Sequence, residues 1–141
     1  MTMSEVSLTT VDTNVIVRHL LDDHEDHSPR ASALFLRVRQ GEEAVFCPDT
    51  VIFEAVYILH GLAGAPRSET ANSLLLLIEL PLFHMAHKSA IKAGLGFWTT
   101  QRALDFADCY HFALTEAMGM TRIYTFGKKM DRYPGVERVE P

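Results

Sequence analysis

Four carboxylates stand at positions where an α/β protein can use them for chemistry. Asp12 follows a short apolar stretch in "TTVDTNV", Glu54 lies inside "VIFEAVYIL", and Asp105 and Asp108 open the segment "LDFADCYHFAL". Carboxylates brought close together repel one another and raise one another's pKa, and a hard divalent cation relieves that repulsion. Oxygen-only ligands suit Mg²⁺ or Mn²⁺, which can activate a water and neutralise charge on a phosphodiester. Together, the four acids predict a metal-dependent phosphodiester site.

Three of these acids also have a purely structural interpretation. Asp12 could cap the helix that follows it, because Asp is favoured at that position. Asp105 and Asp108 share one face near a helix N-terminus, where negative charge is favoured. With His111 and Thr115 they could form the solvated stripe of an amphipathic helix.

Glu54 is the most informative of the four acids. Between Val51 and Leu59 it is the only polar side chain apart from the Tyr57 hydroxyl. A helix that is apolar all round should be buried, and a carboxylate there is costly unless it is paired or binds a metal. The alternatives are that Glu54 faces a solvent gap or pairs with an arginine.

Composition predicts a single cytoplasmic domain. The chain has 141 residues, 48% of them apolar, and a formal net charge of −5, which allows a sizeable core and permits only a local nucleic-acid patch. Cys47 and Cys109 lie in apolar runs and are expected to be reduced core thiols. We expect no N-terminal signal and no membrane segment, because the longest apolar run, "LLLLI", is far too short to span a bilayer.

Strands and helices are expected to alternate along the chain. The predicted strands span 6–11, 43–48, 81–86, 121–126 and 135–140, and the predicted helices span 12–23, 28–40, 50–62, 66–80, 87–100 and 105–118. Ser28 and Asp49 are predicted N-caps, and Gly41 is expected to close the second helix. This alternation predicts an α/β fold with a parallel sheet covered on both faces and a site at the carboxyl ends of its strands.

Four segments, in order, resemble the PIN-domain ribonucleases, in particular the VapC-type toxins of toxin–antitoxin pairs. These segments are "VDTNVIVRHLL", "VIFEAVYIL", "LDFADCYHFALTEAMG" and "IYTFGKKMDRYPGVERV". The resemblance covers nearly the whole length and implies one PIN-like domain over 1–141. It implies a three-layer α/β/α fold with a central, mainly parallel sheet. It also implies Mg²⁺- or Mn²⁺-dependent endoribonuclease activity, a homodimer, and a small antitoxin that blocks the site.

Site residues follow from the same resemblance, position by position. Asp12, Glu54 and Asp108 correspond to the acidic, metal-binding site of the family, and Asp105 to an accessory acid. Asn14 and Thr125 would help to orient groups around it.

A basic run near the end of the chain is a candidate for contacts with the RNA backbone. Arg122, Lys128, Lys129, Arg132 and Arg138 cluster there, and we expect Lys128, Lys129 and Arg132 to contact phosphates. The alternative is a solvated charged face.

Gly127 departs from the pattern of the family. Where the family usually shows Thr-Phe-Asp, this chain has Thr125-Phe126-Gly127. Glycine at an N-cap costs only a few tenths of a kcal/mol against Asp, so the turn should survive while a fourth acid is lost. Asp131 could substitute for it, although an extra helical turn would displace it by roughly 5–6 Å.

Two rival functions therefore stay open. The chain could be a catalytically weakened or inactive PIN module that binds RNA or a partner without cleavage. It could also be a phosphatase of another α/β fold, but Asn14 occupies the position where such enzymes commonly carry a second acid.

Overall fold

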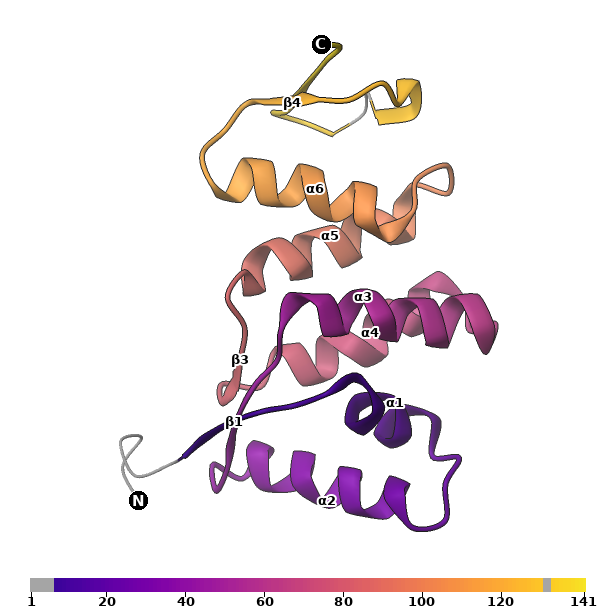
Figure 1. Cartoon of the computed structure of the whole chain (residues 1–141), viewed down its shortest axis with the longest axis vertical. Coiled ribbons are helices and arrows are strands. Elements are labelled where there is room, and N and C mark those ends of the chain that lie inside the picture. Colours follow the sequence, from indigo (N-terminus) through magenta and orange to yellow (C-terminus); the bar gives the residue numbers. More distant parts are fainter. Residues whose placement is uncertain (1–6, 131–132) are drawn as a thin grey trace. The chain divides into compact units, whose positions relative to one another are not determined.

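The structure is a computed structural model that describes residues 7–130 and 133–141 (Figure 1). The chain forms two compact units, of which the first runs to Ala86 and the second from His87 to Pro141. Among the described residues, no helix is both long and apolar enough to cross a bilayer.

The described part of the first unit contains a three-stranded parallel sheet with β2 between β1 and β3. The elements are, in chain order, β1 (Leu8–Thr10), α1 (Thr13–Leu21), α2 (His27–Arg39), β2 (Ala44–Phe46), α3 (Asp49–Val56), the π-helix η2 (Tyr57–Leu62), α4 (Arg67–Ile78) and β3 (Phe83–His84). Thr9 pairs with Val45 in the sheet, and Val45 pairs with Phe83. Within this unit, α1 packs beside α2 and α3 contacts α4 (Figure 1).

Apolar side chains of the helices and of β3 supply the core of the first unit. Ile16, Phe35, Ile52, Leu74 and Phe83 are at most 3% exposed. Burying one such side chain stabilises the folded state by about 1.5–3 kcal/mol. This core holds the carboxyl end of β1 and the helix α3 in fixed positions, which matters below because each carries a candidate acid.

The second unit contains two packed helices and a two-stranded parallel sheet. Its described elements are α5 (Lys88–Thr100), α6 (Phe106–Ala117), β4 (Arg122–Tyr124), the 3₁₀ turn η3 (Lys128–Met130) and β5 (Glu137–Val139). In the sheet, Arg122 pairs with Glu137 and Tyr124 with Val139.

Gly94 lets α5 and α6 approach each other closely. A Cβ atom added at Gly94 would lie 3.1 Å from the Cα atom of Tyr110. Because that neighbour is backbone, it cannot move aside as a side chain could. The interface is completed by Trp98, which is buried and packs edge-on against Phe106.

The structure confirms the predicted α/β fold with parallel strands, but two predicted helix caps are wrong. Helix α2 begins at His27, and Ser28 lies inside it, buried, where its hydroxyl accepts the backbone N–H of His24 at 3.1 Å. The serine therefore caps the preceding turn. Asp49 is the first residue of α3, and Pro48, with φ −57° and ψ 142°, takes the non-helical N-cap position. Asp49 still lies in the first turn, where its charge suits the helix dipole.

The helix predicted over 50–62 changes its winding part-way. Helix α3 ends at Val56 and continues as η2, where the Ala63 N–H donates to the Ile58 carbonyl at 2.8 Å, one residue further back than in an α-helix. Single wide turns of this kind occur mostly as local insertions in α-helices.

Candidate active site

Asp12 lies at the junction between β1 and α1. The Val11 N–H donates to the Phe46 carbonyl at 2.9 Å and continues the sheet to the residue before Asp12. Asp12 then takes the extended N-cap conformation, with φ −94° and ψ 163°. Among the described residues, which include the whole first turn of α1, the exposed Asp12 side chain makes no hydrogen bond to that turn. Asp12 thus has the cap position without the cap bond, and its carboxylate is available to a ligand.

Thr13, which the sequence did not single out, connects Glu54 to this junction. Its side chain is only 4% exposed, and its hydroxyl donates to Oε2 of Glu54 at 3.0 Å. The two residues are 41 positions apart, and their bond joins the first residue of α1 to α3. The carboxylate of Glu54 is thereby held beside the residue that follows Asp12.

The expectation that the helix around Glu54 is buried on all sides is wrong, and Glu54 faces solvent, which is one of the two alternatives given above. Helix α3 buries Val51, Ile52, Ala55 and Val56 against the core, whereas Glu54 is exposed. The apolar residues around Glu54 in the sequence therefore do not form a helix that is buried on all sides. The Thr13 hydroxyl that donates to Glu54 is neutral, so this contact leaves the charge of the carboxylate uncompensated and open to solvent or a cation.

Asp105 caps the helix that carries Asp108. Asp105 has extended backbone geometry, and its Oδ1 accepts the backbone N–H of Asp108 at 2.9 Å. An N-cap bond of this kind contributes about 1 kcal/mol. The prediction that Asp105 and Asp108 lie together at the start of a helix is confirmed, and Asp105 takes a structural role there.

Burial raises the pKa of Asp108 above its ordinary value, and the neighbouring charge of Asp105 raises it further. A hydrogen bond from the Asp105 backbone and the charge of His111 act in the opposite direction but are smaller. A carboxyl held above its usual pKa by a second carboxylate is in the electrostatic state that a divalent cation relieves.

Thr125 and Gly127 form the turn after β4. The Thr125 hydroxyl accepts the Gly127 N–H at 3.0 Å and donates to Sδ of Met130 at 3.4 Å. Gly127 then precedes the short η3 turn, and its carbonyl accepts the Met130 N–H at 3.2 Å and the Arg138 Nε–H at 2.9 Å. The turn therefore forms with glycine at this position. Thr125 holds the turn together, and its hydrogen bonds to Gly127 and Met130 do not orient the acids.

The basic residues near the end of the chain do not act alike. Lys128 and Lys129 are exposed, as a role in phosphate binding requires. Arg138 instead folds back onto the Gly127 carbonyl and pairs with Glu140 at 2.6 Å. Arg132 and Asp131, predicted respectively as a phosphate contact and a substitute acid, lie outside the described residues.

Each unit holds two of the predicted acids: in the first, Glu54 is bonded to Thr13, the neighbour of Asp12, and in the second, Asp105 is bonded to Asp108. Among the residues that the structure describes, no group of three or more His, Cys, Asp or Glu side chains is arranged to hold a metal ion. The donor chemistry nevertheless fits a hard cation, because the first pair offers exposed carboxylate oxygens and the second is strained by like charge.

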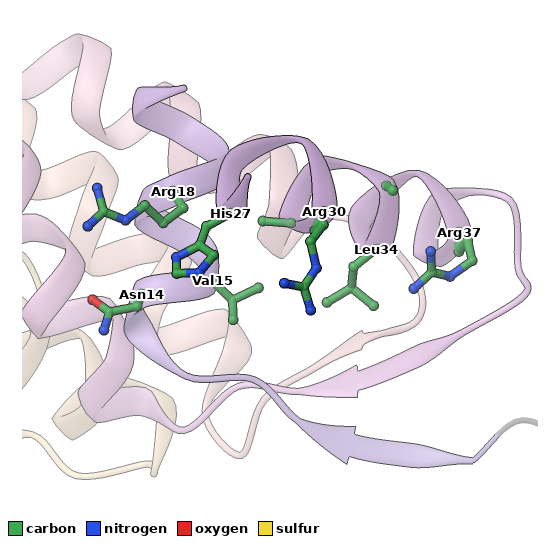
Figure 2. Close-up of a pocket in the computed structure, with 9 residues that line it drawn as sticks. Asn14, Val15, Arg18, His27, Arg30, Leu34 and Arg37 are labelled. Atoms are coloured by element: carbon green, nitrogen blue, oxygen red, sulfur yellow. The ribbon is translucent and has the colours of Figure 1, made fainter. Parts of the chain in front are cut away.

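A groove lined by arginines opens beside Asn14. It has a volume of about 580 Å³ and lies between α1 and α2, with Arg18, Arg30 and Arg37 among its lining residues. Figure 2 shows Asn14 at one end of the groove and Arg37 at the other. Asn14 is exposed and borders this groove. The residue predicted to orient groups near Asp12 therefore lies at the edge of the groove.

Comparison with known proteins gives a family match over most of the chain. The sequence pattern of the family described as "PIN domain" matches residues 9–136. The chain belongs to the PIN-domain family. The matched residues include Asp12, Glu54, Asp105 and Asp108, and also Gly127.

Individual PIN-domain relatives are distant. The "VapC ribonuclease" of Aquifex aeolicus (strain VF5) is 24% identical over 131 residues, which covers 93% of this chain and 95% of the relative. A crystal structure of VapC20 from Mycobacterium tuberculosis, a sarcin–ricin loop cleaving toxin, is 16% identical, with a TM-score of 0.39 over 96% of this chain and 100% of that one. The predicted family, with distant homology to VapC ribonucleases, is confirmed.

Two features of this PIN domain escaped prediction. Thr13 lies between Asp12 and Asn14, which were both predicted site residues. Residue types and their spacing do not indicate a hydrogen bond across 41 positions. The groove did have a signal, because Arg30, Leu34 and Arg37 recur at helical spacing on one face of α2.

Proposed function

We propose that this chain is a metal-dependent endoribonuclease and the toxin of a type II toxin–antitoxin pair, built as one PIN-like domain over 1–141 and acting in the cytoplasm. The observation that carries the proposal is the Thr13–Glu54 hydrogen bond, because it holds a second carboxylate beside the Asp12 junction in a member of the PIN-domain family. The relative that is named a VapC ribonuclease supports the choice of RNA as the substrate.

In this proposal, Asp12, Glu54 and Asp108 are the residues that would hold Mg²⁺ or Mn²⁺. When bound, such a cation supplies Lewis-acid activation of water and neutralises charge that develops on a phosphodiester. Thr13 keeps Glu54 oriented, and Asp105 caps α6 so that Asp108 is fixed at the first turn. Asn14 orients groups near Asp12, Thr125 holds the turn after β4, and exposed Lys128 and Lys129 contact phosphates. Arg132 remains a proposed phosphate contact from the sequence alone.

The direct test is cleavage of RNA by protein purified free of any antitoxin. We expect cleavage with Mg²⁺ or Mn²⁺, none with EDTA, and loss of cleavage in the Asp12→Asn variant. Glu42→Gln is the matched control, because it also removes one exposed carboxylate from the first unit but none of the proposed ligands. Absence of cleavage with both metals would reject the enzyme proposal.

The second candidate function is a binding module that has lost its chemistry, and Gly127 is the observation that favours it. A Cβ atom at Gly127 would lie 3.1 Å from Sδ of Met130 and 3.3 Å from Oγ1 of Thr125. The Met130 thioether is the end of a flexible side chain, so a small shift accommodates Gly127→Asp. We expect this variant to fold, which makes it a fair test of the missing acid.

Gly127→Asp separates the two functions by its effect on cleavage, with Gly127→Asn as the uncharged control of similar size. Stimulation by Asp and not by Asn identifies a weakened nuclease. If neither variant cleaves RNA and the wild type still binds it, the chain is a binding module.

The proposed partners are a second copy of this chain and a small DNA-binding antitoxin with a disordered tail. Light scattering of the purified chain should give the mass of a homodimer. Co-expression with the small reading frame next to its gene should yield a complex whose RNA cleavage is suppressed. A monomeric mass would reject the homodimer. A co-expressed product that neither binds the chain nor inhibits cleavage would reject the antitoxin.

A further inference from the structure

The groove between α1 and α2 presents hydrogen-bond donors above an apolar floor. Val15, Ala31 and Leu34 supply aliphatic surface, and Arg18, Arg30 and Arg37 supply guanidinium groups. In Figure 2 the side chains of Val15, Arg30 and Leu34 project from the two helices toward the same space. Guanidinium groups only donate hydrogen bonds, so the charged side chains lining this groove suit an anionic chain.

Spacing along α2 suits a ligand with repeated anions. Arg30, Leu34 and Arg37 share one face, and the seven-residue step from Arg30 to Arg37 advances about 10 Å along the helix. Arg18 adds a third guanidinium from α1. Each planar fork can bind a phosphate through two N–H groups.

Each of these arginines already has an acidic neighbour, but the pairs are weak. Arg18 lies 3.0 Å from Asp23, Arg30 lies 3.2 Å from Asp26, and Arg37 lies 3.5 Å from Glu43. The Arg30 and Arg37 side chains are 73% and 44% exposed. Ion pairs at such exposure contribute about 0–1 kcal/mol, so a phosphate can displace the carboxylate or share the guanidinium.

The groove begins close in the chain to the proposed active-site residues of the first unit. Asn14 borders the groove and lies two residues after Asp12 in the chain, and Thr13 between them holds Glu54. A chain lying in the groove would therefore contact Asn14, two residues after Asp12 in the chain. No Phe, Tyr or Trp is among the described residues that line the groove, so contact with the backbone is favoured over stacking of bases.

We propose that the α1–α2 groove binds the sugar–phosphate backbone of single-stranded RNA and leads that strand to Asp12 and Glu54. This inference rests on the proposed ribonuclease function and adds the surface on which the substrate lies. It predicts binding that tolerates changes of sequence and weakens as salt increases.

The test measures binding of a short labelled single-stranded RNA in EDTA by fluorescence anisotropy, over a series of salt concentrations. Arg37→Gln and Arg30→Gln should each weaken binding by on the order of fivefold, and the slope of log affinity against log salt should shrink by about 0.7 per lost contact. Arg39→Gln is the matched control: it removes the same charge from an exposed position on the same helix, outside the residues that line the groove. It should change affinity by less than about twofold, since charges that make no phosphate contact act only through screened, longer-range attraction. Equal effects of all three variants would overturn the proposal that RNA binds in the groove.

A second ligand and a second readout keep the outcomes distinct. If Arg30→Gln and Arg37→Gln abolish binding of an acidic peptide of alternating Leu and Glu but leave RNA affinity unchanged, the groove is a peptide site and the RNA proposal fails. If wild-type protein cleaves RNA and these variants bind and cleave RNA like Arg39→Gln, the proposal of RNA binding in the groove is rejected and the proposed enzyme function is supported. If wild-type protein binds RNA through these arginines in EDTA but cleaves nothing with Mg²⁺ or Mn²⁺, the groove stands and the enzyme function fails.

Discussion

The two pairs of acids in this chain are held in different ways. In the first unit, Asp12 and Glu54 come from separate elements, and a buried threonine hydroxyl connects the second acid to the residue after the first. In the second unit, Asp105 and Asp108 are three residues apart, and the backbone N–H of one binds the carboxylate of the other. The first pair depends on tertiary packing, whereas the second forms with one turn of helix.

This difference has electrostatic consequences. Glu54 accepts a bond from a neutral hydroxyl and is exposed. Asp108 is partly desolvated and lies beside a second carboxylate, so its pKa is raised. The position of Glu54 should therefore be sensitive to the loss of the Thr13 hydroxyl, and the pKa of Asp108 to the charge of Asp105.

The largest expected effect separates the two members of the local pair. Asp108→Asn should lower metal-dependent RNA cleavage by on the order of 10²-fold, because a metal ligand contributes several kcal/mol of transition-state stabilisation and each 1.36 kcal/mol is tenfold. Asp105→Asn should cost much less, since the asparagine oxygen can still cap α6. Initial cleavage rates at saturating Mg²⁺ measure both. Equal losses would show that Asp105 acts as a ligand and is more than a cap.

Thr13 should show a smaller effect that depends on chemistry and not on volume. Thr13→Val keeps the shape but removes the hydroxyl, and a bond to a charged group contributes about 1.5 kcal/mol at the low end. Cleavage should fall on the order of tenfold, with more Mg²⁺ needed for half-maximal rate. Thr13→Ser should keep cleavage while losing about 1 kcal/mol of stability with its buried methyl group.

Thr70→Val is the control for the Thr13 variants. Thr70 is 2% exposed, and its hydroxyl has no hydrogen-bond partner among the described residues. Its replacement should leave cleavage unchanged and should not lower the free energy of unfolding. If Thr13→Val cleaves RNA like Thr70→Val, the hydroxyl does not position Glu54.

The cap of α6 should appear in stability before it appears in catalysis. Asp105→Ala removes the acceptor for the Asp108 N–H and should lower the free energy of unfolding by about 1 kcal/mol, whereas Asp105→Asn should lie within a few tenths. Urea denaturation followed by circular dichroism measures the difference. Similar destabilisation in both variants would mean that the charge, and not the cap bond, stabilises this turn.

The smallest expected effect is on titration. Because the pKa of Asp108 is raised in the folded state, the folded chain binds this proton more tightly than the unfolded chain does. The associated stability is fully present below the ordinary Asp pKa and is lost as pH rises through the raised value. Asp105→Asn removes the second-largest cause, so the Asp108 titration observed by carbon NMR should move to lower pH. An unchanged midpoint would leave burial as the whole cause.

Prediction from sequence succeeded where the controlling interactions are local. The strand before Asp12 and the helix start at Asp105–Asp108 follow from alternation and capping preferences, and both are present in the structure. Ser28 and Asp49 were misplaced by one or two positions, because several residues competed for each helix start. The helix around Glu54 was expected to be buried on all sides, because the apolar pattern of α3 does not reveal which part of its circumference the core covers.

By itself, the sequence determined the order of strands and helices, the positions of the four acids and membership of the PIN-domain family, since all three depend on residue type and near-neighbour spacing. Only the tertiary structure decided that Thr13 holds Glu54 and that Arg18, Arg30 and Arg37 line one groove beside Asn14. The physical reason is the same in both cases. A hydrogen bond across 41 residues and a groove between two helices depend on packing of side chains distant in the chain, and local propensity carries no record of that packing.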